Sequence, residues 1–142
     1  MSGFAFAIPL LLQLAAAAQL GIATLNLFLV PLLNWKEEVA RMPLLLREVF
    51  QVHAWFISIT LCIFAVMTWR FATEMASGTN PVCQWLAAGI GTFWAIRAVL
   101  QVTYYSSSHW RGQPGRTLAH ILLLATYASF AAIYLRVALG TS

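Results

Sequence analysis

Hydrophobic residues fill four long stretches of the chain, and polar residues gather in the short connections between them. Each stretch exceeds the ~18 consecutive apolar residues that mark a membrane-spanning helix. The pattern therefore predicts an all-α, integral membrane four-helix bundle, with a single transmembrane domain over residues 1–142. The predicted spans are 8–33, 48–70, 84–106 and 118–138.

The connection after the first stretch carries a signal for a helix of its own. Asn34 followed by Glu37 resembles a capping box, with asparagine in place of the usual serine or threonine. We expect a short interfacial helix over residues 35–42. Proline suits the first turn of a helix, so the next helix is expected to begin at Pro43.

The composition agrees with a membrane protein, because 61% of the residues are hydrophobic and only 8% are charged. Soluble domains carry about 25% charged residues. The formal net charge is +4, but the basic residues are few and scattered. They suit anionic lipid headgroups better than nucleic acid. Membrane lipids are therefore expected partners, and nucleic acid is not.

The distribution of lysine and arginine predicts the orientation, because positive charge concentrates in cytoplasmic loops. Five basic residues lie in or beside the first and third connections, and two lie near the opposite ends of spans. Both termini are therefore expected outside, in a bacterial-type inner membrane. The five residues are Lys36, Arg41, Arg47, Arg111 and Arg116, and the two are Arg70 and Arg136.

Arg97 is the most unusual residue of the chain, because it lies near the middle of the third predicted span. A guanidinium in hydrocarbon costs at least about 2.5–3.5 kcal/mol on insertion scales, so it is expected to face inward and to find a partner. Glu48 is the only acidic residue that could reach it, from the interface. A ligand anion and an acidic residue of another subunit are the other candidates.

Polar residues from all four predicted spans fall in the cytoplasmic half of the bilayer. Those on the third span follow the i, i+4, i+7 spacing of one helix face. Inward-facing stripes of this kind predict a polar intramembrane pocket. Packing alone is the competing interpretation, because polar side chains also join helices to one another. The candidate ligand-binding residues are Arg97, Gln101, Tyr104, His53, His120, Asn26 and Tyr127.

Two of these residues suggest a cofactor hypothesis. His53 and His120 lie on the second and fourth spans, which run in the same direction, and two such imidazoles could ligate a b-type haem. A quinone or a lipid headgroup would fit the same pocket with less geometric demand. No other metal site is expected, because the two cysteines are too few and too far apart.

The favoured functional hypothesis is an accessory or structural subunit of a larger membrane complex, or a homo-oligomer, with the polar pocket on its cytoplasmic side. Ala17 and Gly21, four residues apart on the first span, allow close approach of another helix. The alternative is a redox or cofactor protein that binds haem, quinone or a lipid headgroup. No catalytic residue is predicted, because no nucleophile stands beside an oriented base.

Overall fold

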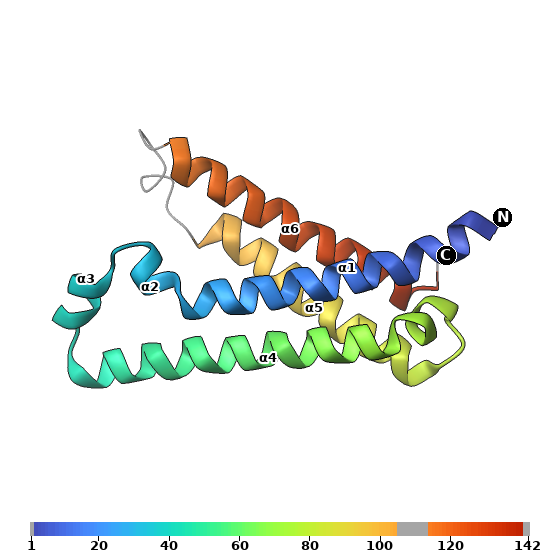
Figure 1. Cartoon of the computed structure of the whole chain (residues 1–142), viewed down its shortest axis with the longest axis horizontal. Coiled ribbons are helices and arrows are strands. Elements are labelled where there is room, and N and C mark those ends of the chain that lie inside the picture. The colour runs from blue at the N-terminus through green and yellow to red at the C-terminus, as the bar shows by residue number, and fades with distance from the viewer. Residues whose placement is uncertain (1, 105–113, 141–142) are drawn as a thin grey trace. The chain divides into compact units, whose positions relative to one another are not determined.

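The computed structural model describes residues 2–104 and 114–140, and this described part is helical without strands (Figure 1). Four of its helices are long and apolar enough to cross a membrane. The predicted all-α fold with four spans is therefore confirmed, and the chain is a small integral membrane protein. The helices are α1 (Ser2–Leu27), α2 (Leu29–Leu32), α3 (Lys36–Arg41), α4 (Leu44–Ser77), α5 (Pro81–Thr103) and α6 (Pro114–Ala138).

The helices group into two compact units. The first unit comprises residues 1–12 and 71–142, and the second comprises residues 13–70. Phe71, where α4 passes from the second unit to the first, has non-helical backbone angles (φ −109°, ψ 16°) that kink the helix. The first unit therefore contains α5 and α6, and the second contains most of α1 and α4.

α1 ends at Leu27, six residues before the predicted end of the first span. Pro31 explains the difference, because proline lacks a backbone N–H and its ring conflicts with the carbonyl group four residues earlier. That carbonyl belongs to Leu27, the last residue of α1, so Pro31 removes the hydrogen bond that would carry the helix on. The single turn of α2 follows, and Asn34 then adopts the left-handed region with φ 56°. The chain thus turns where the sequence pattern predicts a straight helix.

The predicted interfacial helix is present as α3. The predicted capping box is wrong: the N-cap is Trp35, and no side chain caps the helix. Asn34, the residue before the N-cap, instead forms a turn with left-handed backbone angles. The next helix begins at Leu44, directly after Pro43 and four residues before the predicted start of the second span. The fixed φ of proline favours a helix start at this position.

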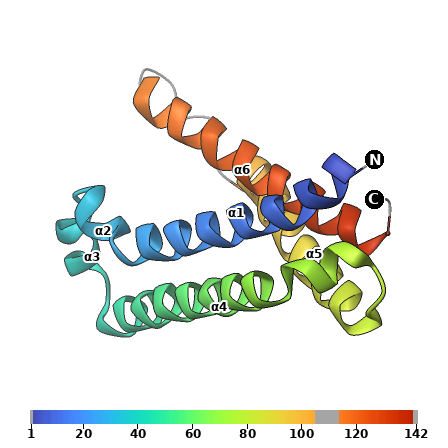
Figure 2. The same cartoon turned by 45° about the vertical axis from the view of Figure 1, so that its right-hand side comes forward.

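In the second unit, α1 and α4 run side by side (Figure 2) and bury small residues. Ala23 of α1 and Ser58 and Ala65 of α4 are each at most 3% exposed. Small side chains let two membrane helices approach closely, which replaces the hydrophobic drive that lipid cannot supply. The core of this unit therefore consists mainly of small side chains, with Gln19 and Leu61 among the larger buried ones.

In the first unit, α5 starts from a well-defined cap. The Asn80 side chain accepts a hydrogen bond from the backbone N–H of Val82 at 3.0 Å, and Pro81 occupies the first helical turn. This capped start follows the turn around Gly78, whose φ of 67° suits glycine. The cap therefore defines where α5 begins.

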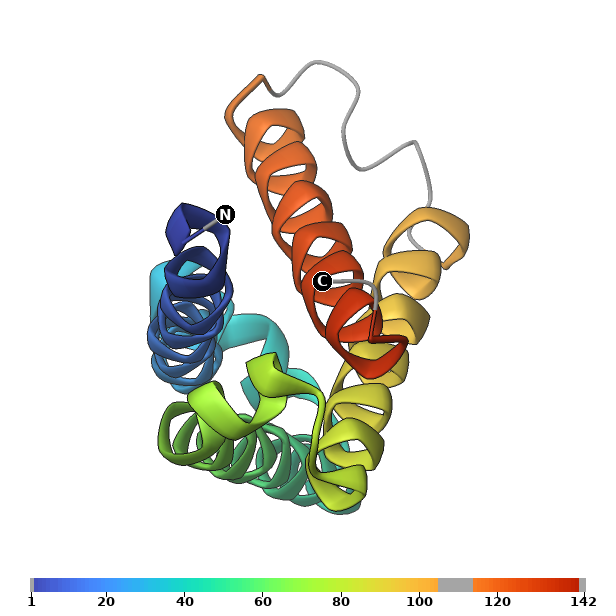
Figure 3. The same ribbon diagram turned by 90° about the vertical axis from the view of Figure 1, so that its right-hand side faces the viewer.

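α5 and α6 pack against each other in the first unit (Figure 3). Gly91 marks the closest approach, because a Cβ atom added there would lie 3.0 Å from the backbone nitrogen of Leu135. Trp94 and Tyr134 are almost fully buried in the same unit. The contact between α5 and α6 thus combines one glycine with large aromatic side chains, and it positions the polar residues described next.

Candidate functional site

Arg97 of α5 lies over an aromatic ring of α6. Its guanidinium carbon is 5.0 Å from the centroid of Tyr127, which is 5% exposed. A guanidinium over the face of an aromatic ring is attracted by the ring's negative quadrupole, and the attraction strengthens when water is excluded. The sequence suggested only anions as partners for Arg97. The structure adds the face of Tyr127, which lowers the cost of the charge without an acidic residue.

The Tyr127 ring is itself held by other aromatic residues. It stacks on Trp94 with centroids 5.1 Å apart and an angle of 25° between the rings. Trp94 also makes an edge contact with Phe130, at 4.8 Å and 61°. Such pairs add about 0.5–1.5 kcal/mol beyond the area they bury. The ring beneath Arg97 therefore has a fixed position rather than a freely rotating one.

Gln101, one turn beyond Arg97 on α5, joins the two helices through a hydrogen bond. Its Nε2 donates to Nδ1 of His120 at 2.9 Å, so Nδ1 acts as the acceptor in this arrangement. Gln101 is 3% exposed, and its Oε1 has no hydrogen-bond partner among the described residues. A buried acceptor of this kind costs about 1–3 kcal/mol when unpaired. It is the atom of the cluster to which a water molecule or a ligand donor would bind.

These contacts bring together four of the predicted site residues in one group, which we call the α5–α6 cluster. Tyr104 does not join it. It shares the helical spacing of Arg97 and Gln101, but it is the C-cap of α5 and is 84% exposed. The polar pattern also missed Trp94, the residue that holds the cluster's ring. The cluster consists of Trp94, Arg97, Gln101, His120 and Tyr127.

The other predicted residues belong to the second unit, where Asn26 has a defined role. Its Nδ2 donates to the carbonyl oxygen of Ala54 at 2.9 Å and to Oγ of Ser58 at 3.0 Å. Ser58 in turn donates to the carbonyl oxygen of Ala23 at 3.0 Å. Asn26 therefore joins α1 to α4, in agreement with the interpretation that polar residues connect helices.

His53 and Glu48 are exposed on α4, away from this contact. The Nδ1 of His53 lies 3.2 Å from the carbonyl oxygen of Val49 on the same helix. The stripe of α4 that is buried or half-buried includes Ala54, Ser58, Leu61 and Ala65, at spacings of four, three and four. That spacing is the signal in the sequence from which the role of Ser58 could be predicted.

The cofactor hypotheses remain predictions. A haem held by His53 and His120 would need residues of both units. Within the described residues, no group of three or more His, Cys, Asp or Glu side chains could hold a metal ion. No family model, curated protein or solved structure matches this chain, so the residues themselves carry the functional argument.

The Asn26 contact leads to a stability prediction. Ser58→Ala removes two hydrogen bonds between α1 and α4, each worth about 0.6 kcal/mol in a membrane protein, so a loss of about 1 kcal/mol is expected. The measurement is reversible unfolding in mixed micelles with increasing dodecyl sulfate. Thr60→Val is the matched control, because the Thr60 hydroxyl donates only to Phe56 of its own helix. Equal losses in both variants would contradict the assigned role of Ser58.

Proposed function

We propose that the protein is a structural or accessory membrane subunit that associates with another membrane protein or with further copies of itself. The observation that carries this proposal is that polar side chains inside the spans connect one helix to another. Arg97 lies on Tyr127, Gln101 bonds to His120, and Asn26 joins α1 to α4. In each case the polar group links one helix to another, which is a structural use of intramembrane polarity.

The outer face of α1 supports an association surface. Ala17 and Gly21 are exposed, whereas Ala16 and Ala23 of the same helix are buried. A Cβ atom added at Gly21 would meet nothing within 4 Å. Small residues four apart are typical of faces where membrane helices approach closely. This face is therefore the proposed contact for a partner helix.

The mass of the protein in mild detergent and in native membranes tests the association. We expect a complex heavier than one chain, either a homo-oligomer after purification or a larger assembly on native gels of solubilised membranes. Gly21→Ile should dissociate it, because the branched side chain keeps the partner helix away. Gly89→Ile is the matched control, since a Cβ atom there also meets nothing within 4 Å. A monomer in both preparations would refute the proposal.

We also propose that the protein resides in a bacterial-type inner membrane with both termini outside. The greater number of basic residues in the first and third connections supports this orientation. An alkaline phosphatase fused to the C-terminus, active only outside the cytoplasm, tests it. A fusion that is fully expressed but inactive would show that the C-terminus lies in the cytoplasm, opposite to the proposed orientation.

A further inference from the structure

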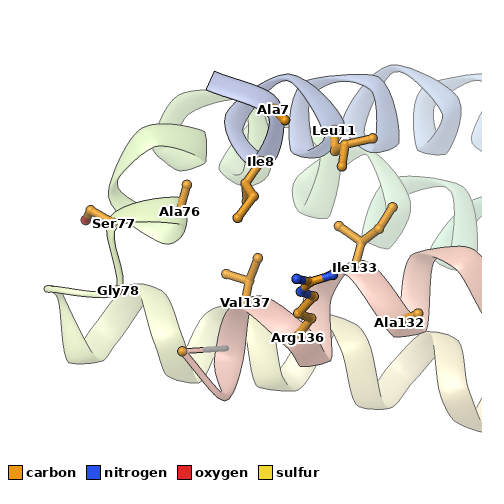
Figure 4. Close-up of a pocket in the computed structure, with 11 residues that line it drawn as sticks. Ala7, Ile8, Leu11, Ala76, Ser77, Gly78, Ala132, Ile133, Arg136 and Val137 are labelled. Atoms are coloured by element: carbon orange, nitrogen blue, oxygen red, sulfur yellow. The ribbon is translucent and has the colours of Figure 1, made fainter. Parts of the chain in front are cut away.

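The first unit contains a cavity at the end of the spans opposite the α5–α6 connection. Its volume is about 360 Å³, within the range of about 300–1,000 Å³ typical of small-molecule pockets. The start of α1, the end of α4 and the last turns of α6 line it (Figure 4). Three of the four candidate membrane spans begin or end beside it, so we expect the cavity to lie near a membrane surface, at the level of phospholipid headgroups.

The lining of the cavity has two chemical parts. Most of it is apolar, with Ile8 and Leu11 from α1 and Ile133 and Val137 from α6. Arg136 supplies the positive charge, and its guanidinium is directed into the space bounded by the apolar side chains (Figure 4). An apolar chamber with one cation at the headgroup level is complementary to a molecule with a hydrocarbon chain and an anionic head.

The lining has one further polar side chain, that of Ser77. The Ser77 hydroxyl donates to the carbonyl oxygen of Glu74 at 2.9 Å and lies 2.9 Å from the Thr79 hydroxyl. It is thus engaged within its own turn. Arg136 lies in the last turn of α6, and a long cationic side chain at a helix end readily reaches the headgroup region. The cation of the cavity can therefore reach the level expected for a lipid phosphate.

We propose that this cavity binds an anionic phospholipid, with one acyl chain against the apolar lining and the phosphate at Arg136. This inference does not depend on the proposed subunit role. It also differs from the headgroup pocket that the sequence predicted, because it uses Arg136 rather than Arg97. A basic pocket between membrane helices attracts an anionic headgroup through its charge, and with both termini outside this pocket would face the outer leaflet.

Native mass spectrometry of the purified protein, titrated with phosphatidylglycerol or phosphatidylcholine of the same acyl chains, tests the proposal. One basic residue near a membrane surface contributes about 1 kcal/mol to anionic lipid binding, which corresponds to about fivefold. Wild type is expected to prefer phosphatidylglycerol about fivefold. Arg136→Leu should remove this preference, and Arg136→Lys should retain it. An equal preference in Arg136→Leu and wild type would overturn the proposal.

Three further measurements distinguish binding in this cavity from general electrostatic attraction between the protein and anionic lipids. Ile8→Trp fills the cavity and should weaken the binding of both lipids, with helical content unchanged by circular dichroism. Arg41→Leu removes an exposed cation outside the cavity and should leave the preference unchanged. Inorganic phosphate alone should not displace the phospholipid, because it lacks the acyl chain. Unweakened binding in Ile8→Trp, a lost preference in Arg41→Leu, or displacement by phosphate would each refute the site.

Discussion

Replacing Gly91 by leucine is expected to separate α5 from α6 and to cause the largest loss of stability of any change discussed. A Cβ atom at this position would lie 2.9 Å from Cγ of Leu135 and 3.0 Å from its backbone nitrogen. The Leu135 side chain can rotate away, but its backbone cannot move without shifting α6. Overpacking in a core costs about 1–3 kcal/mol and occasionally more, and a full leucine places this variant at about 3 kcal/mol or above.

The measurement is the free energy of unfolding in mixed micelles, followed by circular dichroism and by tryptophan fluorescence, since Trp94 lies one turn away in the same contact. Gly91→Ala should fall between wild type and the leucine variant. Gly89→Leu is the control on the same helix, because nothing lies within 4 Å of a Cβ atom at that position. If Gly89→Leu and Gly91→Leu were equally stable, the close approach of α5 to α6 would be contradicted.

This expectation depends on a contact that the sequence pattern did not reveal. The four spans and the interfacial helix followed from long apolar stretches and turn residues, because each of these signals is local. Gly91 and Gly89 are equivalent in the sequence, yet only one of them faces a neighbouring backbone. Which face of a membrane helix packs is set by its partner, and apolar residues surround the helix on all sides.

The boundaries that were mispredicted have similar local causes. The first span was extended to residue 33 because hydrophobicity does not weaken there, while Pro31 ends the helix through its ring and missing N–H. The predicted capping box is wrong because Asn34 adopts the left-handed conformation, in which asparagine is enriched among non-glycine residues. At Pro31 and at Asn34, the residue types of the segment favour a continuous or capped helix. The backbone conformation of the proline or asparagine produces a turn instead.

Only part of the candidate site follows from the sequence, because spacing along one helix is a local signal and contacts between helices are not. The spacing of Arg97 and Gln101 placed them on one face of α5, and both lie in the α5–α6 cluster. The sequence cannot show that the charge of Arg97 lies on an aromatic ring, because Tyr127 is thirty residues away on another helix. Acidic groups are only one of the chemistries that stabilise a guanidinium in a membrane, and an aromatic face is another.

Tyr127→Leu is expected to destabilise the protein by about 3 kcal/mol, measured by the same unfolding experiment. The substitution removes the face beneath Arg97, worth about 2 kcal/mol when water is excluded, and the stacked pair with Trp94, worth about 0.5–1.5 kcal/mol. Tyr127→Phe is the matched control, because it retains both ring contacts and should lose much less. A loss as large in the phenylalanine variant would assign the effect to the hydroxyl group instead.

A double-mutant cycle separates the two contributions of this ring. Arg97→Leu alone is expected to stay within about 1 kcal/mol of wild type, because it removes both the attraction and the cost of a charge in hydrocarbon. In that background Tyr127→Leu should cost about 2 kcal/mol less than in wild type. Additivity within about 0.5 kcal/mol would show that the ring does not stabilise the charge. The charge of Arg97 would then have to be stabilised by another of its contacts or by one of the anions that the sequence predicts.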